Sequence, residues 1–354
     1  MKNWESNVRK VVPYIPGEQP KRARIIKLNT NENPYPPAPG VAEALKNFDA
    51  DRLRLYPDPT IEQLVGAIAD NYGVNSSQVF VGVGSDDVLA MIFMTFFNGK
   101  KPILFPDISY SFYEVWADML RIPYEKVALD EKLCIQPMDY AKENGGVIFP
   151  NPNAPTGELL SLEHVEEIIR YNPDVLVVVD EAYIDFGGES ALSLIDKYDN
   201  LIVVQTFSKS RSMAGARIGF AISNEKVIHY LNDVKYSFNS YTMDAVTIET
   251  GTKAIEDRAY FESTKAKIIA TREWTKEQLN RLGFVFGDSQ SNFIFATHPK
   301  AEAQKLFEAL KEAGIFVRYF SKPERISNYL RITIGTQEEM KEFIAFVEQY
   351  LENM

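Results

Sequence analysis

The sequence predicts an α/β protein: a large domain with a mostly parallel sheet flanked by helices, followed by a smaller α+β domain. Three observations support this prediction. Short apolar runs alternate with helical patterns, which is typical of parallel sheets. The continuous run Val175 to Val179 indicates a strand buried on both faces. The length of 354 residues suits about two domains of roughly 150 residues each.

The domains are expected at residues 1–40, 41–245 and 246–354. The first range is an extended arm, because proline fixes φ and removes a hydrogen-bond donor. Seven prolines fall within it: Pro13, Pro16, Pro20, Pro34, Pro36, Pro37 and Pro39.

In the large domain, a helix is expected from Ile61 to Tyr72 with Thr60 as its N-cap, because apolar residues recur there at helical spacing. A strand, a glycine turn and a second helix follow at Val79 to Val81, Gly82 to Ser85 and Asp86 to Phe97. Further strands are expected at Pro102 to Phe105, Val147 to Phe149, Val175 to Val179, Leu201 to Val204 and Ile218 to Ile222, with helices at Phe112 to Leu120 and His164 to Arg170.

In the small domain, a long helical and charged stretch runs from Thr242 to Leu282. Periodicity then predicts three strands and two helices. The strands are at Asn292 to Ala296, Phe316 to Arg318 and Leu330 to Ile334, and the helices at Ala301 to Glu312 and Thr336 to Leu351.

Composition excludes several partners. The formal net charge of −11 argues against nucleic acid and anionic membrane surfaces. The single cysteine, Cys134, cannot form an intrachain disulfide, and three scattered histidines give no metal site. The longest apolar run, Val88 to Phe97, is too short to span a bilayer, and the N-terminus lacks a signal core. We therefore expect a cytoplasmic protein without a metal.

The chemistry is expected at the carboxyl ends of the strands, where open parallel sheets bind ligands. Taken singly, the polar residues there have ordinary structural explanations. Asp180 would cap a turn, Lys209 would be solvated, Arg217 would form a surface ion pair, and Asn153 would be a turn residue between prolines. The pair Gly82 and Gly84 lacks the third glycine of a dinucleotide fingerprint.

Together these residues suit pyridoxal phosphate, which presents a phosphate, an aldehyde, a pyridine nitrogen and a phenolic oxygen. The helix start at Ser85 and Asp86, with Ser208 and Arg217, suits the phosphate. Lys209 near a cation suits the aldehyde. The remaining two groups fit three side chains: Asp180 for the ring nitrogen, and Tyr183 and Asn153 for the ring oxygen.

The same blocks resemble a known family. Asn151 to Gly157, Asp180 to Tyr183, Phe207 to Lys209 and Arg217 to Gly219 are similar to the fold-type I aminotransferases. The blocks Pro13 to Gly17, Leu28 to Pro34 and Tyr56 to Asp58 more narrowly resemble histidinol-phosphate aminotransferases, and the similarity covers essentially the whole chain. Four positions depart from the common pattern: Ala154, Ser210, Arg211 and Ser237.

The resemblance implies a catalytic set of Lys209, Asp180 and Tyr183, with Lys209 linked covalently to the cofactor. It implies that Tyr110 stacks on the cofactor ring and that Asn153 and Tyr183 contact the ring hydroxyl. Around the phosphate it places Ser85, Asp86, Thr206, Ser208 and Arg217, with Tyr56 reaching across from the second subunit of a homodimer. The substrate anion is expected at Arg331, with Arg318, Tyr14 and Asn33 nearby.

The implied reaction is transamination between L-histidinol phosphate and 2-oxoglutarate, giving imidazole acetol phosphate and glutamate in histidine biosynthesis. Two alternatives share the scaffold: an aromatic amino acid aminotransferase, since Arg331 could equally hold a carboxylate, and a threonine-phosphate decarboxylase. A nicotinamide dehydrogenase and a ligand-sensing regulator come from other classes. The regulator would carry a basic DNA-binding extension, and no helix-turn-helix pattern precedes the large domain. The sequence leaves the exact amine substrate and the extent of domain closure open.

Overall fold

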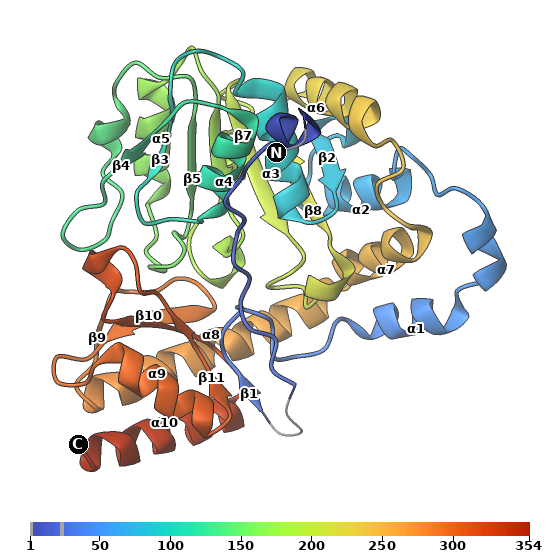
Figure 1. Ribbon diagram of the computed structural model, residues 1–354. Helices are drawn as coiled ribbons and strands as arrows, with labels where there is room; N and C mark the ends of the chain where they lie inside the picture. The colour runs from blue at the N-terminus through green and yellow to red at the C-terminus, as the bar shows by residue number, and fades with distance from the viewer. Residues whose placement is uncertain (1–2, 22–24) are drawn as a thin grey trace.

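The computed structural model describes residues 3–21 and 25–354, and a seven-stranded sheet forms its larger part (Figure 1). The strands lie in the order β2-β8-β7-β6-β5-β3-β4, and β8 alone among them runs antiparallel to its neighbours. Their bounds are β2 (Val79–Gly82), β3 (Ile103–Pro106), β4 (Tyr124–Val127), β5 (Val147–Pro150), β6 (Val177–Asp180), β7 (Leu201–Thr206) and β8 (Gly219–Ile222).

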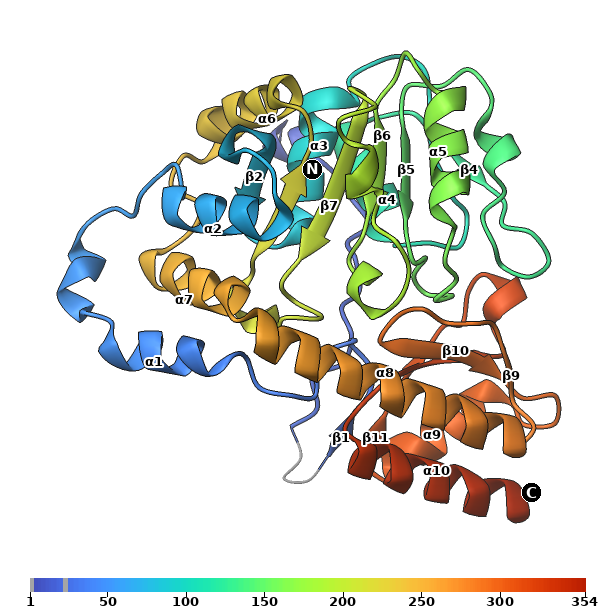
Figure 2. The same cartoon turned by 180° about the vertical axis from the view of Figure 1, so that it is seen from behind.

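Helices cover both faces of this sheet (Figures 1 and 2). Successive residues of a strand point to opposite faces, so Val177 and Val179 pack into one hydrophobic cluster and Val178 into another. The first cluster includes residues of α2 (Glu62–Tyr72), α5 (Leu162–Tyr171) and α7 (Ala245–Glu256), and the second includes residues of α3 (Ser85–Phe96), α4 (Phe112–Leu120) and α6 (Glu225–Phe238). This arrangement confirms the predicted α/β class. Strands β2 to β8 with α2 to α6 are called the large-sheet unit below.

A second, smaller sheet lies beside the first, and Figure 2 shows the long helix α8 (Arg258–Arg281) leading down to it from α7. Its strands lie in the order β12-β13-β10-β9 and pair antiparallel throughout. The elements of this small-sheet unit are β9 (Val285–Phe286), β10 (Phe293–Thr297), α9 (Ala303–Glu312), β11 (Ile315–Phe316), β12 (Arg318–Tyr319), β13 (Tyr329–Thr333) and α10 (Gln337–Glu352).

Two predictions about these elements are wrong. The single strand expected from Phe316 to Arg318 is two strands, because the chain changes pairing partner at Val317: β11 pairs with β1 (Ile26–Lys27) and β12 with β13. Thr60 does not cap the first large-domain helix. Instead, the carboxylate of Asp58, two residues before Thr60, accepts the backbone N–H of Glu62 at 2.8 Å.

The N-terminal arm runs across both units (Figure 1). Arg9 donates to the carbonyl of Met119 on α4, and the ring of Tyr14 stacks on Phe112 with centroids 4.3 Å apart. Farther along, Arg318 of β12 donates to the carbonyl of Ile15. The arm also contains β1, which pairs in parallel with β11, and proline content gave no sign of this strand. The arm is followed by α1 (Pro39–Asn47), which packs on α7.

Within the described ranges, every helix is either too short or too polar to cross a bilayer.

Candidate active site

The polar strand ends meet at one edge of the large sheet. Asp180 pairs in register with Pro150 on one side and Val204 on the other, while Gly82 and Thr206 both pair with Gly219. A cavity of about 280 Å³ opens at this edge, and we call it the sheet-edge cavity. Nine predicted site residues line it: Ser85, Asp86, Tyr110, Asp180, Tyr183, Thr206, Ser208, Lys209 and Arg217.

Lys209 projects its amine into the cavity from the segment that follows β7. Its Nζ donates to the backbone carbonyl of Thr30 at 3.1 Å and lies 5.8 Å from the ring centre of Tyr183. The side chain of Asn33 donates to the carbonyls of Lys209 and Ser210, both at 3.1 Å. Asn33 therefore holds the lysine segment and is not among the lining residues, and its contact with substrate stays a prediction.

Asp180 is buried at the end of β6 with one oxygen satisfied and one free. Its Oδ2 accepts the hydroxyl of Tyr113 at 2.8 Å, whereas Oδ1 has no partner among the described residues. Burial raises the pKa of Asp180 to about 6, and the Tyr113 hydrogen bond opposes that rise. Buried carboxylate oxygens are usually hydrogen-bonded, so Oδ1 is an acceptor available to a bound molecule. Sequence reasoning missed Tyr113, because an aromatic residue inside a helix is usually a core residue.

The start of α3 lies beside Arg217 at the sheet-edge cavity. Helix N-termini carry free N–H groups and partial positive charge, and Gly84 precedes the helix with φ of 87°. A side chain at Gly84 would place its Cβ 2.4 Å from Arg217 Nη2, so glycine is needed for the arginine to approach. Arg217 pairs with Asp86 at 3.2 Å, and Tyr110 donates to the other oxygen of Asp86 at 2.7 Å.

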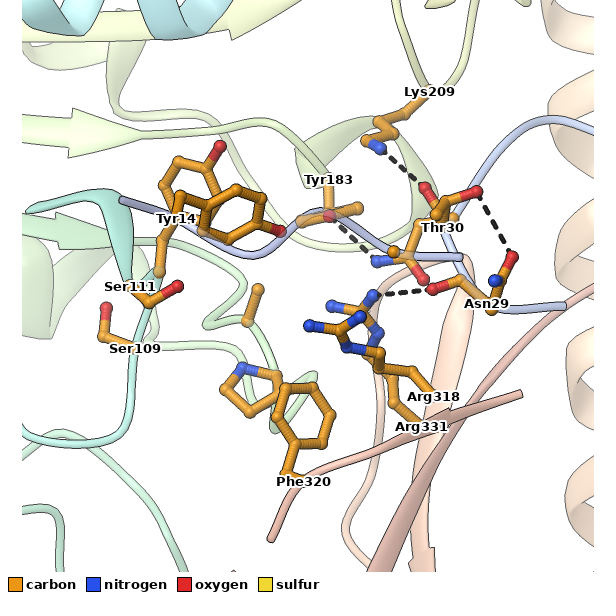
Figure 3. A pocket seen from close by; sticks show the side chains of 15 residues that line it. Tyr14, Asn29, Thr30, Ser109, Ser111, Tyr183, Lys209, Arg318, Phe320 and Arg331 are labelled. Carbon is orange, nitrogen blue, oxygen red and sulfur yellow. Dashed lines mark hydrogen bonds between the residues drawn. The ribbon is translucent and has the colours of Figure 1, made fainter. Parts of the chain in front are cut away.

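A second cavity of about 180 Å³ adjoins the first and is called the arginine cavity (Figure 3). Tyr14, Arg318 and Arg331, the predicted substrate residues, line it, and their contact with substrate stays a prediction. Lys209, Tyr110 and Tyr183 line both cavities.

Arg318 and Arg331 stand opposite each other on β12 and β13, so both guanidinium groups point into the arginine cavity. Arg331 donates to the carbonyl of Asn29 at 3.1 Å, and its buried Nε has no partner within residues 3–21 and 25–354. Burial lowers the pKa of Arg331, and the charge of Arg318 lowers it further. Among the described residues, no carboxylate forms an ion pair with Arg331. The cavity therefore holds two adjacent cations that lack an anion.

Besides Asn33, two predicted residues lie outside both cavities. Asn153 is buried and donates to the carbonyl of Ile108 at 3.0 Å and to Thr156 at 3.1 Å, while its Oδ1 has no partner among the described residues. Tyr56 is 82% exposed and contacts the ring of Tyr241. Neither role is tested by this arrangement, and both stay predictions.

The four departures from the common pattern fall into two groups. Ala154 lines both cavities. The other three point away from them: Ser210 donates to Asp185, Arg211 lies 4.3 Å from the ring centre of Phe261, and Ser237 is exposed near the end of α6. Only Ala154 can therefore touch a molecule bound in either cavity.

Comparison with known proteins identifies the family. A family model described as aminotransferase class I and II matches residues 23–347. A histidinol-phosphate aminotransferase of Lactococcus lactis subsp. cremoris (strain MG1363) is 50% identical over 351 residues, covering 99% of this chain and 98% of the relative. One of Pseudomonas putida (strain W619) is 55% identical over 335 residues, covering 95% and 96%.

Solved structures share the fold at lower identity. A histidinol-phosphate aminotransferase from Sinorhizobium meliloti in complex with pyridoxal-5'-phosphate aligns with a TM-score of 0.85 and 24% identity, covering 93% of this chain and 92% of that one. An L-threonine-O-3-phosphate decarboxylase from Porphyromonas gingivalis aligns at 0.80 and 23%, covering 93% and 100%. The fold alone thus does not separate these activities. Matched by the family model along most of its length and by relatives at half identity or more, the chain belongs to the aminotransferase class I and II family, among the histidinol-phosphate aminotransferases.

Proposed function

We propose that this aminotransferase uses pyridoxal phosphate to transfer the amino group of L-histidinol phosphate to 2-oxoglutarate, in the cytoplasmic synthesis of histidine. The products are imidazole acetol phosphate and glutamate. The observation that carries the substrate assignment is the pair of arginines in the arginine cavity. Two adjacent guanidinium groups suit a phosphate dianion better than the single charge of a carboxylate.

The sheet-edge cavity fits pyridoxal phosphate on three counts. The unpartnered Oδ1 of Asp180 is placed to accept a ring N–H. The start of α3 with Arg217 supplies a cradle for a phosphate. Lys209 supplies an amine within the same cavity, for linkage to an aldehyde. When bound there, the cofactor would act as an electron sink that stabilises negative charge at the substrate carbon.

Each of the chain's own residues would then have a separate role in the reaction. Asp180 keeps a proton on the ring nitrogen, and Tyr183 donates a hydrogen bond toward the ring oxygen. Lys209 would be the general base and acid that moves a proton at the substrate carbon. Arg331 and Arg318 hold the substrate anion, and the arm residue Tyr14 lies beside them in the same cavity.

A steady-state comparison of four donors, each with 2-oxoglutarate, tests the substrate. L-Histidinol phosphate is expected to give the highest kcat/KM, ahead of phenylalanine and tyrosine. The fourth compound, O-phospho-L-threonine, should release no carbon dioxide. A higher kcat/KM for tyrosine or phenylalanine would establish the aromatic aminotransferase alternative instead, and carbon dioxide release would establish the decarboxylase.

Arg331→Lys is expected to lower kcat/KM by about tenfold to a hundredfold in both half-reactions, because the phosphate of the donor and a carboxylate of 2-oxoglutarate use the same clamp. Lysine keeps the charge and one hydrogen bond but loses the second parallel hydrogen bond of a planar guanidinium, which is worth about 1.5–3 kcal/mol to a charged group. Single-turnover rates of each half-reaction measure the effect.

The matched control is Arg281→Lys on the outer side of α8, where the arginine pairs with Glu348 far from both cavities. It should leave both half-reactions at the wild-type rate. If Arg331→Lys lowers thermal stability and leaves both rates intact, Arg331 is a structural residue and the phosphate-bearing substrate loses its main support.

We also propose a homodimer in which Tyr56 reaches the cofactor phosphate of the second subunit. Tyr56 lies outside both cavities of its own chain and is 82% exposed, together with Leu53 at 61% and Leu55 at 58%. These residues belong to the segment between α1 and α2, which projects from the body of the molecule (Figure 1). Such a cluster of exposed apolar side chains favours an interface.

Mixing Tyr56→Ala with Lys209→Ala subunits should regenerate activity, although each variant alone is inactive or strongly impaired. A mixed dimer has one site with both residues intact, so random exchange should restore about a quarter of wild-type activity. Assays after dissociation and reassociation measure the recovery. A fully active monomer at high dilution, or no recovery in verified mixed dimers, would refute the shared site.

A further inference from the structure

Asn31 sits between the two units with all its polar groups engaged. It is 1% exposed, and its Nδ2 donates to the hydroxyl of Tyr183 at 2.9 Å. Its backbone N–H donates to Thr333 Oγ1 at 3.0 Å, the same hydroxyl donates back to Asn31 Oδ1 at 2.9 Å, and its carbonyl accepts from Asn292 at 3.0 Å. Thr333 and Asn292 belong to or flank strands of the small-sheet unit, whereas Tyr183 follows β6.

From this arrangement we infer that Asn31 is a positioning residue that sets the direction in which the Tyr183 hydroxyl donates, and that Thr333 of β13 fixes Asn31 in turn. The inference rests on the proposed contact between Tyr183 and the ring oxygen of pyridoxal phosphate. It adds a role for two residues that the motif comparison did not single out.

The donor directions follow from the chemistry of each group. A backbone N–H can only donate, so the Thr333 hydroxyl must accept from Asn31 and give its own hydrogen to Asn31 Oδ1. With Oδ1 thus committed to Thr333, the amide turns its N–H toward Tyr183. The Tyr183 oxygen therefore accepts a hydrogen bond, and its own hydrogen is left for an acceptor in the cavity.

The hydrogen bonds from Thr333 through Asn31 to Tyr183, called the relay below, also connect Arg331 with Tyr183. Thr333 lies two residues after Arg331 on β13, so both side chains project from the same face of that strand. The carbonyl of Asn29 accepts from Arg331, and that of Thr30 accepts from Lys209. Asn31 makes two hydrogen bonds with Thr333 and one with Tyr183. A displacement of β13 would therefore move Asn31 and change its hydrogen bond to Tyr183.

The backbone at Asn31 determines which substitutions are informative. Its φ is 55°, in the left-handed region that asparagine tolerates and alanine does not. Asn31→Gly removes the side chain without adding backbone strain. Thr333→Val keeps the size of the side chain and removes the hydroxyl, and Thr333→Ser retains the hydroxyl as the matched control.

The test is a pH titration of the absorbance of the enzyme loaded with pyridoxal phosphate, without substrate, alongside the Kd of pyridoxal phosphate for the cofactor-free protein. If Tyr183 donates more weakly, the ring oxygen carries more negative charge. This charge would raise the pKa of the neighbouring nitrogen that joins Lys209 to the cofactor. Asn31→Gly and Thr333→Val should therefore raise the midpoint of the titration by about half a pH unit or more, and Tyr183→Phe should raise it in the same direction. Thr333→Ser should keep the wild-type midpoint.

A double substitution separates positioning from general destabilisation. In the Tyr183→Phe background, Thr333→Val should add no further shift, because the relay acts only through the tyrosine hydroxyl. An equal added shift in that background overturns the inference, and so does an unchanged midpoint in folded Thr333→Val and Asn31→Gly proteins. If Tyr183→Phe itself leaves the midpoint and the Kd unchanged, the proposed contact of Tyr183 fails and the relay fails with it.

Discussion

Lys209→Ala is expected to abolish measurable turnover while the protein still folds and binds pyridoxal phosphate without a covalent bond. In the proposed function, the amine of Lys209 is the nucleophile toward the cofactor aldehyde and the carrier of the proton, and general acid–base catalysis alone is worth about 10²–10⁴-fold in rate. The substitution removes a side chain whose described hydrogen bond goes to one carbonyl, that of Thr30, so little stability should be lost.

Borohydride reduction followed by peptide mapping checks the assignment directly. In the wild-type enzyme the reduced adduct should lie on Lys209 alone, and the alanine variant should give none. The neighbouring Lys27 is the informative comparison, since its amine also hydrogen-bonds to Thr30 but pairs with Glu32. An adduct on Lys27, or on any lysine other than Lys209, would show that the nucleophile has been misassigned.

Asp180→Asn is expected to lower the rate by about 10²-fold or more, by analogy with other electrostatic partners removed from active sites. Asparagine can still accept the Tyr113 hydroxyl, but it carries no negative charge to keep a proton on the ring nitrogen. Single-turnover kinetics with L-histidinol phosphate measure the loss. Near wild-type rates in a correctly folded variant would move the electron-sink role to another residue.

Although Asp180→Asn should lower the rate, its cofactor-free form should gain thermal stability relative to the cofactor-free wild type as pH rises. Burial raises the pKa of Asp180 to about 6, so the folded protein binds this proton more tightly than the unfolded chain. This contribution to stability is present at acidic pH and is lost as pH rises through about 6. Thermal melts of cofactor-free proteins should thus favour Asp180→Asn increasingly between about pH 4 and 6. Parallel melting curves for both proteins would contradict the burial argument.

Much of the site's location was predictable, because the end of a strand can be read from neighbouring residues in the sequence. Lys209 directly follows an apolar run that ends at a sheet edge, and Asp180 does the same on the next strand, so the topology of a parallel sheet brings them together. The continuous apolar run Val175 to Val179 also predicted a strand buried on both faces, and Val177 and Val178 indeed pack into different hydrophobic clusters.

The residues that escaped prediction act through contacts distant in sequence. Asn31 meets Tyr183 and Thr333, and Tyr113 meets Asp180, all across segments that no local pattern relates. Val317 shows the same limit for the fold, because a run of apolar residues does not reveal that the chain changes its pairing partner there. The capping of α2 by Asp58 likewise depends on a turn whose geometry is set in three dimensions.

Strand β1 gives this enzyme an order of assembly on the ribosome. It pairs with β11, and the residues after it complete both cavities, although nearly the whole chain is synthesised between the two strands. The large sheet can form from contiguous sequence while translation continues, but Thr30 and Asn31 reach their places only after β13 has emerged. A ribosome stalled before that point would carry a folded sheet without a working active site. The contacts of Thr30 and Asn31 should therefore form late, after the C-terminal strands have left the ribosome.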